Sequence, residues 1–139
     1  MVKPDVVGNK VARASAWLTD AEALVARPAE EFVADVKTRD LASFYIFLAI
    51  QECIDLAAHW IADAGWSVPD DSATLFDVLA DREVIEPNLA ASLRGAVGLR
   101  NRIAHGYATV DHARVQSEFG AGASAMRRFL ARAVSEAGL

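Results

Sequence analysis

The chain has 139 residues, of which 53% are hydrophobic and 24% charged, and this composition predicts one compact domain over residues 1–139. A formal net charge of −5 excludes a protein that binds nucleic acid through a broadly basic surface. No signal sequence is evident, and the longest wholly apolar run, residues 44–50, is too short to cross a bilayer. We therefore expect a soluble, cytoplasmic protein with no membrane partner.

Cysteine and histidine are too few for a disulfide framework or a zinc site. The one cysteine, Cys53, has apolar neighbours at helical spacing, so we expect a small buried side chain. The three histidines, His59, His105 and His112, are widely separated. We expect no metal and no cofactor, and any hydrolytic chemistry should be metal-free.

Apolar residues recur at helical spacing along the whole chain, which predicts an all-α, up-and-down bundle of four to five helices. The first helix should run from about residue 6 to 26 and end before Pro28. A short helical piece should follow at 30–36. The longest helix should cover 41 to about 64, with Thr38 as N-cap. Its first half is apolar on every side and should form the buried centre of the bundle.

Three further helices complete the predicted bundle. After a loop at 65–71, Leu75 and Leu79 mark a short helix. Pro87 suits the first turn of the next helix, which should end at Gly106. Asp111 can cap the last helix. The expected packing stripe of that helix consists of Val115, Phe119, Gly122, Met126, Phe129, Leu130 and Ala133.

A polar stripe runs along the second half of the longest helix. It is formed by Gln51, Asp55, His59 and Asp63, with Glu52 beside it. A stripe of this kind is usually the solvated face of a helix. The functional alternative is that Glu52 or Asp55 orients His105 or pairs with Arg100.

Residues 100–107 place an arginine, an amide and an imidazole at the end of one helix. On a helical wheel Arg100 falls in the centre of an apolar stripe. Loss of hydration there costs its guanidinium free energy, unless an anion, a ligand or another chain binds it. The alternative is that the long side chain of Arg100 bends outward to solvent. His105 would then lie in the last turn only because the helix dipole favours a histidine there. The spacing leaves both interpretations open.

The neighbouring residues add to this pattern. Asn101 and His105 share a second helix face with Arg94 and Gly98. Basic residues gather in the second half of the chain, whereas the acidic excess lies mostly before Pro87. A local positive groove is therefore compatible with the negative net charge of the whole chain.

Arg100, Asn101, His105 and Tyr107 form an R-N-x3-H-x-Y pattern that resembles the signature of the HEPN superfamily. Within that superfamily the chain most resembles the HepT-like toxins, the ribonuclease halves of bacterial toxin–antitoxin pairs. The resemblance includes a long upstream helix over residues 49–57 and an apolar last helix, so it covers most of the chain. It implies an endoribonuclease with RNA as substrate.

Metal-free RNA cleavage needs a base for the 2′-hydroxyl, an acid for the leaving oxygen and positive charge at the phosphate. One histidine serves both proton transfers poorly, so we expect a homodimer in which two motif helices share one cleft. Our hypothesis assigns proton transfer to His105 and phosphate stabilisation to Arg100. Asn101 would hold the phosphate or the imidazole by a hydrogen bond.

By its residue type alone, Tyr107 would simply pack the turn after the helix. The resemblance implies another role, because in HepT-like pairs the antitoxin is a minimal nucleotidyltransferase that transfers AMP to the tyrosine two residues after the histidine. Tyr107 occupies that position. AMP bound there would fill the cleft and repel RNA.

Two other interpretations remain open. The chain could be a non-catalytic HEPN helical module that binds a nucleotidyltransferase partner or a nucleotide, which its acidic charge favours. It could also be a plain homodimeric bundle in which Arg100 pairs across the interface with Glu52 or Asp55.

Overall fold

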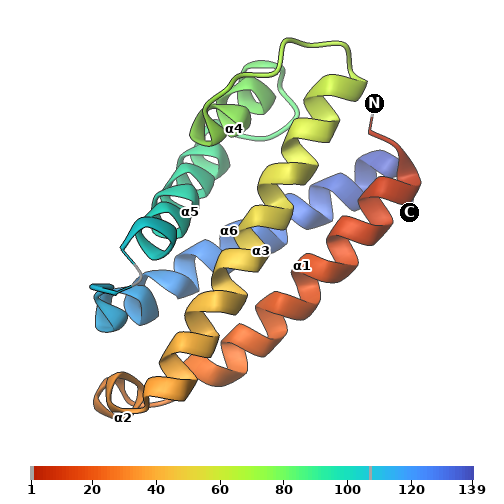
Figure 1. Cartoon of the computed structure of the whole chain (residues 1–139). Coiled ribbons are helices and arrows are strands. Elements are labelled where there is room, and N and C mark those ends of the chain that lie inside the picture. The colour runs from red at the N-terminus through yellow and green to blue at the C-terminus, as the bar shows by residue number, and fades with distance from the viewer. Residues whose placement is uncertain (1, 107) are drawn as a thin grey trace.

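The computed structural model describes residues 2–106 and 108–139, and within them the chain forms six α-helices and no strand (Figure 1). The helices are α1 (Pro4–Val25), α2 (Ala29–Ala34), α3 (Val36–Asp63), α4 (Ser72–Asp81), α5 (Pro87–His105) and α6 (His112–Ala137). The all-α prediction is confirmed. The two short segments predicted to be helical are α2 and α4, and with both counted the described chain has six helices, one more than the expected four to five.

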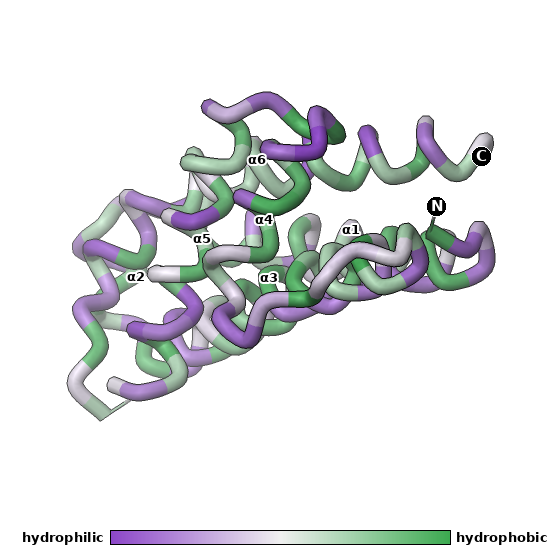
Figure 2. Tube along the Cα trace, turned by 90° about the horizontal axis from the view of Figure 1, so that it is seen from above, coloured by the Kyte–Doolittle hydropathy of each residue, from purple (hydrophilic) through white to green (hydrophobic). Residues whose placement is uncertain are grey.

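The longest helix, α3, lies at the centre of the bundle. It runs antiparallel to α1, and the short α2 makes the corner between them (Figure 1). On its other side α3 contacts α4 and α5, while α6 crosses behind and contacts α1, α3 and α5. The chain ends of α1 and α6 lie at the same end of the bundle. Hydropathy alternates around most helices, as expected where one face is packed and the other is solvated (Figure 2).

Aromatic side chains hold three helices together at one end of the core. Phe129 of α6 meets Phe76 of α4 edge-on, with 5.3 Å between ring centroids, and Trp60 of α3 lies 6.2 Å from the same ring. Such pairs add specific geometry to the burial of large apolar surfaces. The predicted α6 stripe is confirmed, because all seven of its members are buried.

The start of α3 differs from the prediction. The helix begins at Val36, and its N-cap is Asp35 rather than Thr38. Asp35 accepts a hydrogen bond from the Thr38 backbone N–H at 3.2 Å and pairs with Arg27 at 2.9 Å. A carboxylate that meets both a free helix N–H and a cation is a better cap than the threonine hydroxyl. The other ends agree, since Pro87 opens α5, Gly106 closes it and Asp111 caps α6.

The first half of α3 is not buried on every side, so this part of the prediction was wrong. Phe44 is 54% exposed and Leu41 is 41% exposed, because no described helix covers that side of α3. By length and composition α3 could cross a bilayer, yet half of its most apolar window is packed inside the bundle. Cys53 is buried as predicted, and burial raises the pKa of its thiol.

Asp35 gives a test of the α2–α3 corner. Hydrogen bonds from Arg27 and from the Thr38 backbone lower the pKa of Asp35 from 3.8 to about 2. Since the folded pKa is lowered, the carboxylate stabilises the fold above about pH 4, and this contribution is lost as the pH falls toward about 2. We expect Asp35→Asn to melt below the wild type at neutral pH, with the difference shrinking on acidification. Thermal unfolding followed by circular dichroism across this range measures it.

The matched control is Asp20→Asn, because Asp20 is an exposed carboxylate on α1 for which the structure gives no ion pair. If the difference in melting temperature between Asp35→Asn and the wild type stays constant with pH, the charge of the Asp35 carboxylate does not stabilise the fold.

Candidate active site

The last two turns of α5 carry the candidate residues, and they place them on different sides of the helix. Arg100 and Asn101 are half-buried, whereas His105 is exposed at the helix end. Arg100 and His105 are five residues apart, which separates them by roughly 140° around the helix axis. A single chain therefore does not bring the guanidinium and the imidazole into one pocket.

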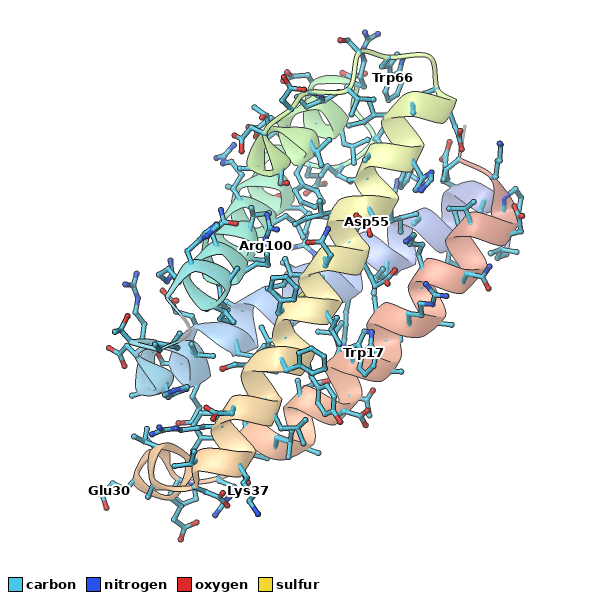
Figure 3. The ribbon with its side chains drawn as sticks, viewed as in Figure 1. Trp17, Glu30, Lys37, Asp55, Trp66 and Arg100 are labelled. Atoms are coloured by element: carbon cyan, nitrogen blue, oxygen red, sulfur yellow. The ribbon has the colours of Figure 1, made fainter. Side chains whose placement is uncertain are left out.

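Arg100 reaches from α5 toward α3 (Figure 3). Its Nη1 donates a hydrogen bond to Oε1 of Gln51 at 3.1 Å, and its Nε is buried with no hydrogen-bond partner among the described residues. In the described part of the chain, no carboxylate lies within ion-pair distance of Arg100. The arginine thus neither snorkels freely nor pairs within the chain with Glu52 or Asp55.

The polar stripe of α3 faces two neighbours instead of solvent alone. Nε2 of Gln51 donates to Oδ1 of Asp55 at 3.0 Å. From α1, Lys10 Nζ lies 3.3 Å from Glu52 Oε2 and 3.5 Å from Asp55 Oδ2. Lys10 and Glu52 are well shielded, with side chains 18% and 15% exposed. Glu52 therefore serves the α1–α3 contact, and only Asp55 is linked to the arginine, through Gln51.

His105 opens onto a hollow between the end of α5 and the start of α6. The hollow has a volume of about 430 Å³ and is lined by Arg102, His105, Gly106, Thr109, Val110, Asp111, Arg114 and Val115. No described residue forms a hydrogen bond with the imidazole. Asn101 lies one turn before His105 on the same face, and its amide is likewise unengaged by the described residues. No contact among the described residues keeps either side chain from meeting a ligand.

The basic residues of the second half do not form an open positive groove. Arg102 and Arg114 beside the hollow both pair with Glu118. Arg94 pairs with Asp77, and Arg132 pairs with Glu136 four residues on. Most arginines after Pro87 thus have a carboxylate partner, whereas Arg100 and the exposed Arg128 have none among the described residues, and of these two only Arg100 is half-buried.

Sequence reasoning missed Gln51 as the partner of Arg100. The four-residue spacing of Gln51 and Asp55 indicated only that these two side chains could hydrogen-bond with each other, and no signal in the sequence placed Gln51 beside Arg100. Tyr107 lies outside the described residues. Among those described, no group of three or more His, Cys, Asp or Glu side chains is arranged to hold a metal ion.

Comparison with known proteins points to one family. Residues 17–133 match the HepT-like family, described as Ribonuclease HepT-like. A putative RNase of Archaeoglobus fulgidus is 32% identical over 87 residues, which are 63% of this chain and 65% of that protein, slightly under two thirds of its length. The mRNA nuclease HepT of Shewanella oneidensis is 26% identical over 103 residues, or 74% of this chain and 77% of that protein.

A solved structure shares the fold. The tri-AMPylated HEPN toxin of Shewanella oneidensis, in complex with its MNT antitoxin, superposes with a TM-score of 0.83 at 23% identity. The match covers 92% of this chain and 96% of the toxin. Because the family match runs from the second half of α1 to about one turn before the end of α6, and so covers most of the chain, the protein belongs to the HepT-like ribonuclease family.

Proposed function

We propose that this chain is a metal-independent endoribonuclease and the toxin of a bacterial toxin–antitoxin pair, acting in the cytoplasm as a homodimer. The observation that carries the proposal is Arg100, a half-buried cation without a carboxylate partner among the described residues, on the same helix end as an exposed and unengaged His105. In a family of ribonucleases, a cation held in place and an imidazole without a hydrogen-bond partner among the described residues, brought into one cleft by two subunits, fit RNA cleavage.

The chemistry uses the RNA's own 2′-hydroxyl. His105 of one subunit takes the 2′-hydroxyl proton while the oxygen attacks phosphorus, and His105 of the second subunit protonates the departing 5′-oxygen. The products are a 2′,3′-cyclic phosphate and a 5′-hydroxyl end. Arg100 stabilises the added negative charge on the phosphorane, and Asn101 donates a hydrogen bond to a phosphate oxygen.

The uncovered side of α3 supplies a dimer surface. Phe44 and Leu41 are exposed there, and Phe44 lines a hollow of about 350 Å³ together with Ile103 and Ala104 from the end of α5. A two-fold interface brings the same surface of both chains together. Two copies joined at this strip would place both α5 ends, and so both copies of His105, beside one cleft.

A nucleotidyltransferase antitoxin would act on Tyr107. The phenolic oxygen attacks the α-phosphate of ATP, AMP becomes attached to the tyrosine and pyrophosphate leaves. The AMPylated state of the Shewanella oneidensis toxin supports this transfer. Tyr107 follows directly on Gly106, which lines the hollow with His105, so the new phosphate would oppose RNA entry.

His105→Ala should abolish cleavage, because loss of a positioned proton-transfer group costs roughly 10²–10⁴-fold in rate. The measurement is the cleavage rate of RNA in the presence of chelator, with a 2′-deoxy substrate that should stay intact. His59→Ala, a change to an exposed histidine of α3, serves as the control. If the wild type leaves RNA intact, the protein is the non-catalytic module instead; equal cleavage by His105→Ala would remove the imidazole from the mechanism.

Phe44→Asp should convert the dimer to a monomer and reduce cleavage in parallel, since a charge in the centre of an apolar contact is strongly unfavourable. Light scattering after size-exclusion chromatography gives the mass. Leu139→Asp changes an exposed leucine at the far end of the chain and should leave the dimer intact. A Phe44→Asp protein that remains dimeric would place the interface elsewhere.

Tyr107→Phe should escape neutralisation. After co-expression with its nucleotidyltransferase, we expect mass spectrometry to find AMP on Tyr107 of the wild type and none on the variant, whose RNA cleavage should persist. Tyr45→Phe changes the one other tyrosine and should be neutralised normally. Normal silencing of Tyr107→Phe would mean that the modification has another target.

A further inference from the structure

Gln51 separates the cation of Arg100 from the nearest carboxylate of the polar stripe. Its Oε1 accepts from Arg100 Nη1 at 3.1 Å, and its Nε2 donates to Asp55 Oδ1 at 3.0 Å. The three side chains come from two helices, α5 and α3, and Figure 3 shows Arg100 and Asp55 on the same side of the bundle. They form a continuous chain of hydrogen bonds.

The direction of this chain is fixed by its two ends. A guanidinium can only donate hydrogen bonds and a carboxylate can only accept them, whereas an amide does both. Asp55 therefore orients Gln51 so that its oxygen faces Arg100. Lys10 of α1 lies beside Asp55 and Glu52, with Arg13 at 3.9 Å from Glu52, and these cations balance the two carboxylates.

We propose that Gln51 is a positioning residue that aims Arg100 without neutralising it. The amide transmits a hydrogen bond but carries no net charge, so the guanidinium keeps its positive charge for an incoming phosphate. The other arginines near the helix end differ, because Arg102 and Arg114 both form ion pairs with one carboxylate, Glu118. This inference rests on the proposed function, since the phosphate is that of the RNA.

Gln51→Glu is the informative variant because the protonation state of the introduced carboxyl group changes what it can do. When protonated, that group reproduces the amide: its carbonyl oxygen accepts from Arg100 and its hydroxyl donates to Asp55. When ionised, it forms an ion pair with Arg100 and repels Asp55. Arg100, together with the more distant Lys10 and Arg13, lowers the pKa of the introduced carboxyl group, whereas Asp55 and Glu52 raise it.

We therefore measure kcat/KM for RNA cleavage by Gln51→Glu and by the wild type from about pH 4.5 to pH 8 and take the ratio, which removes the pH dependence that the two enzymes share. We expect a loss of roughly 10- to 100-fold at the alkaline end, which shrinks as the pH falls and a growing fraction of the introduced carboxyl group becomes protonated. Gln51→Leu, which cannot hold the guanidinium, should lose activity at every pH. Ala91→Glu adds the same charge to an exposed position of α5 and should keep a flat ratio near one.

Stability separates positioning from a structural role. At neutral pH the ion pair between the introduced carboxylate and Arg100 should leave the melting temperature of Gln51→Glu unchanged or raised while its cleavage falls. A structural role would move stability and activity together. A flat pH ratio from a wild type that cleaves RNA would overturn the positioning role and leave the nuclease standing.

A wild type that cleaves no RNA would contradict the proposed function, and RNA affinity then decides the role of Gln51. In the His105→Ala background, fluorescence anisotropy with a labelled RNA should show weaker binding for Gln51→Glu at alkaline pH and recovery at acid pH. Equal affinity across the pH range would overturn the inference on its own.

Discussion

Packing on several sides sets the rotation of α3 about its own axis, and the position of each functional side chain follows from that rotation. Antiparallel contact with α1 occupies one side, and α5 and α6 occupy others. Trp60, packed beside Phe129, fixes the far end of the helix. With the helix held in this orientation, Glu52 faces α1, Gln51 faces α5 and Phe44 is left outside. The partner of Arg100 is thus a consequence of core packing.

The distribution of charge explains how an acidic chain can serve an anionic substrate. With a net charge of −5, the protein cannot rely on a broad positive surface. Most of its arginines form ion pairs with carboxylates, several of which belong to other helices. Such pairs link the helices and weaken the electrostatic potential that the paired arginines contribute at the site. The charge of Arg100 is not balanced by a carboxylate among the described residues, because the group that accepts its hydrogen bond is the uncharged amide of Gln51. One uncompensated and partly desolvated cation acts more strongly at short range than several paired ones.

Helix positions were predictable because each helix carries its own periodic apolar stripe, and the α6 stripe was predicted residue by residue. The ends of helices were less accurate. Thr38 looked like the cap of α3, yet Asp35 took that role because Arg27, eight residues earlier, lies within reach of its carboxylate. The exposure of Phe44 was also hidden, since an apolar residue looks the same in the sequence whether a neighbour covers its side chain or leaves it open.

The amino-acid order was sufficient for the all-α class and for the family signature at Arg100, Asn101, His105 and Tyr107. These features are local, because helical periodicity and motif spacing are properties of neighbouring residues. The choice of Gln51 over Glu52 or Asp55 beside Arg100 came from the packed bundle. These α3 residues lie within about one turn of one another, and only the rotation imposed by contacts among distant segments decides which of them faces α5.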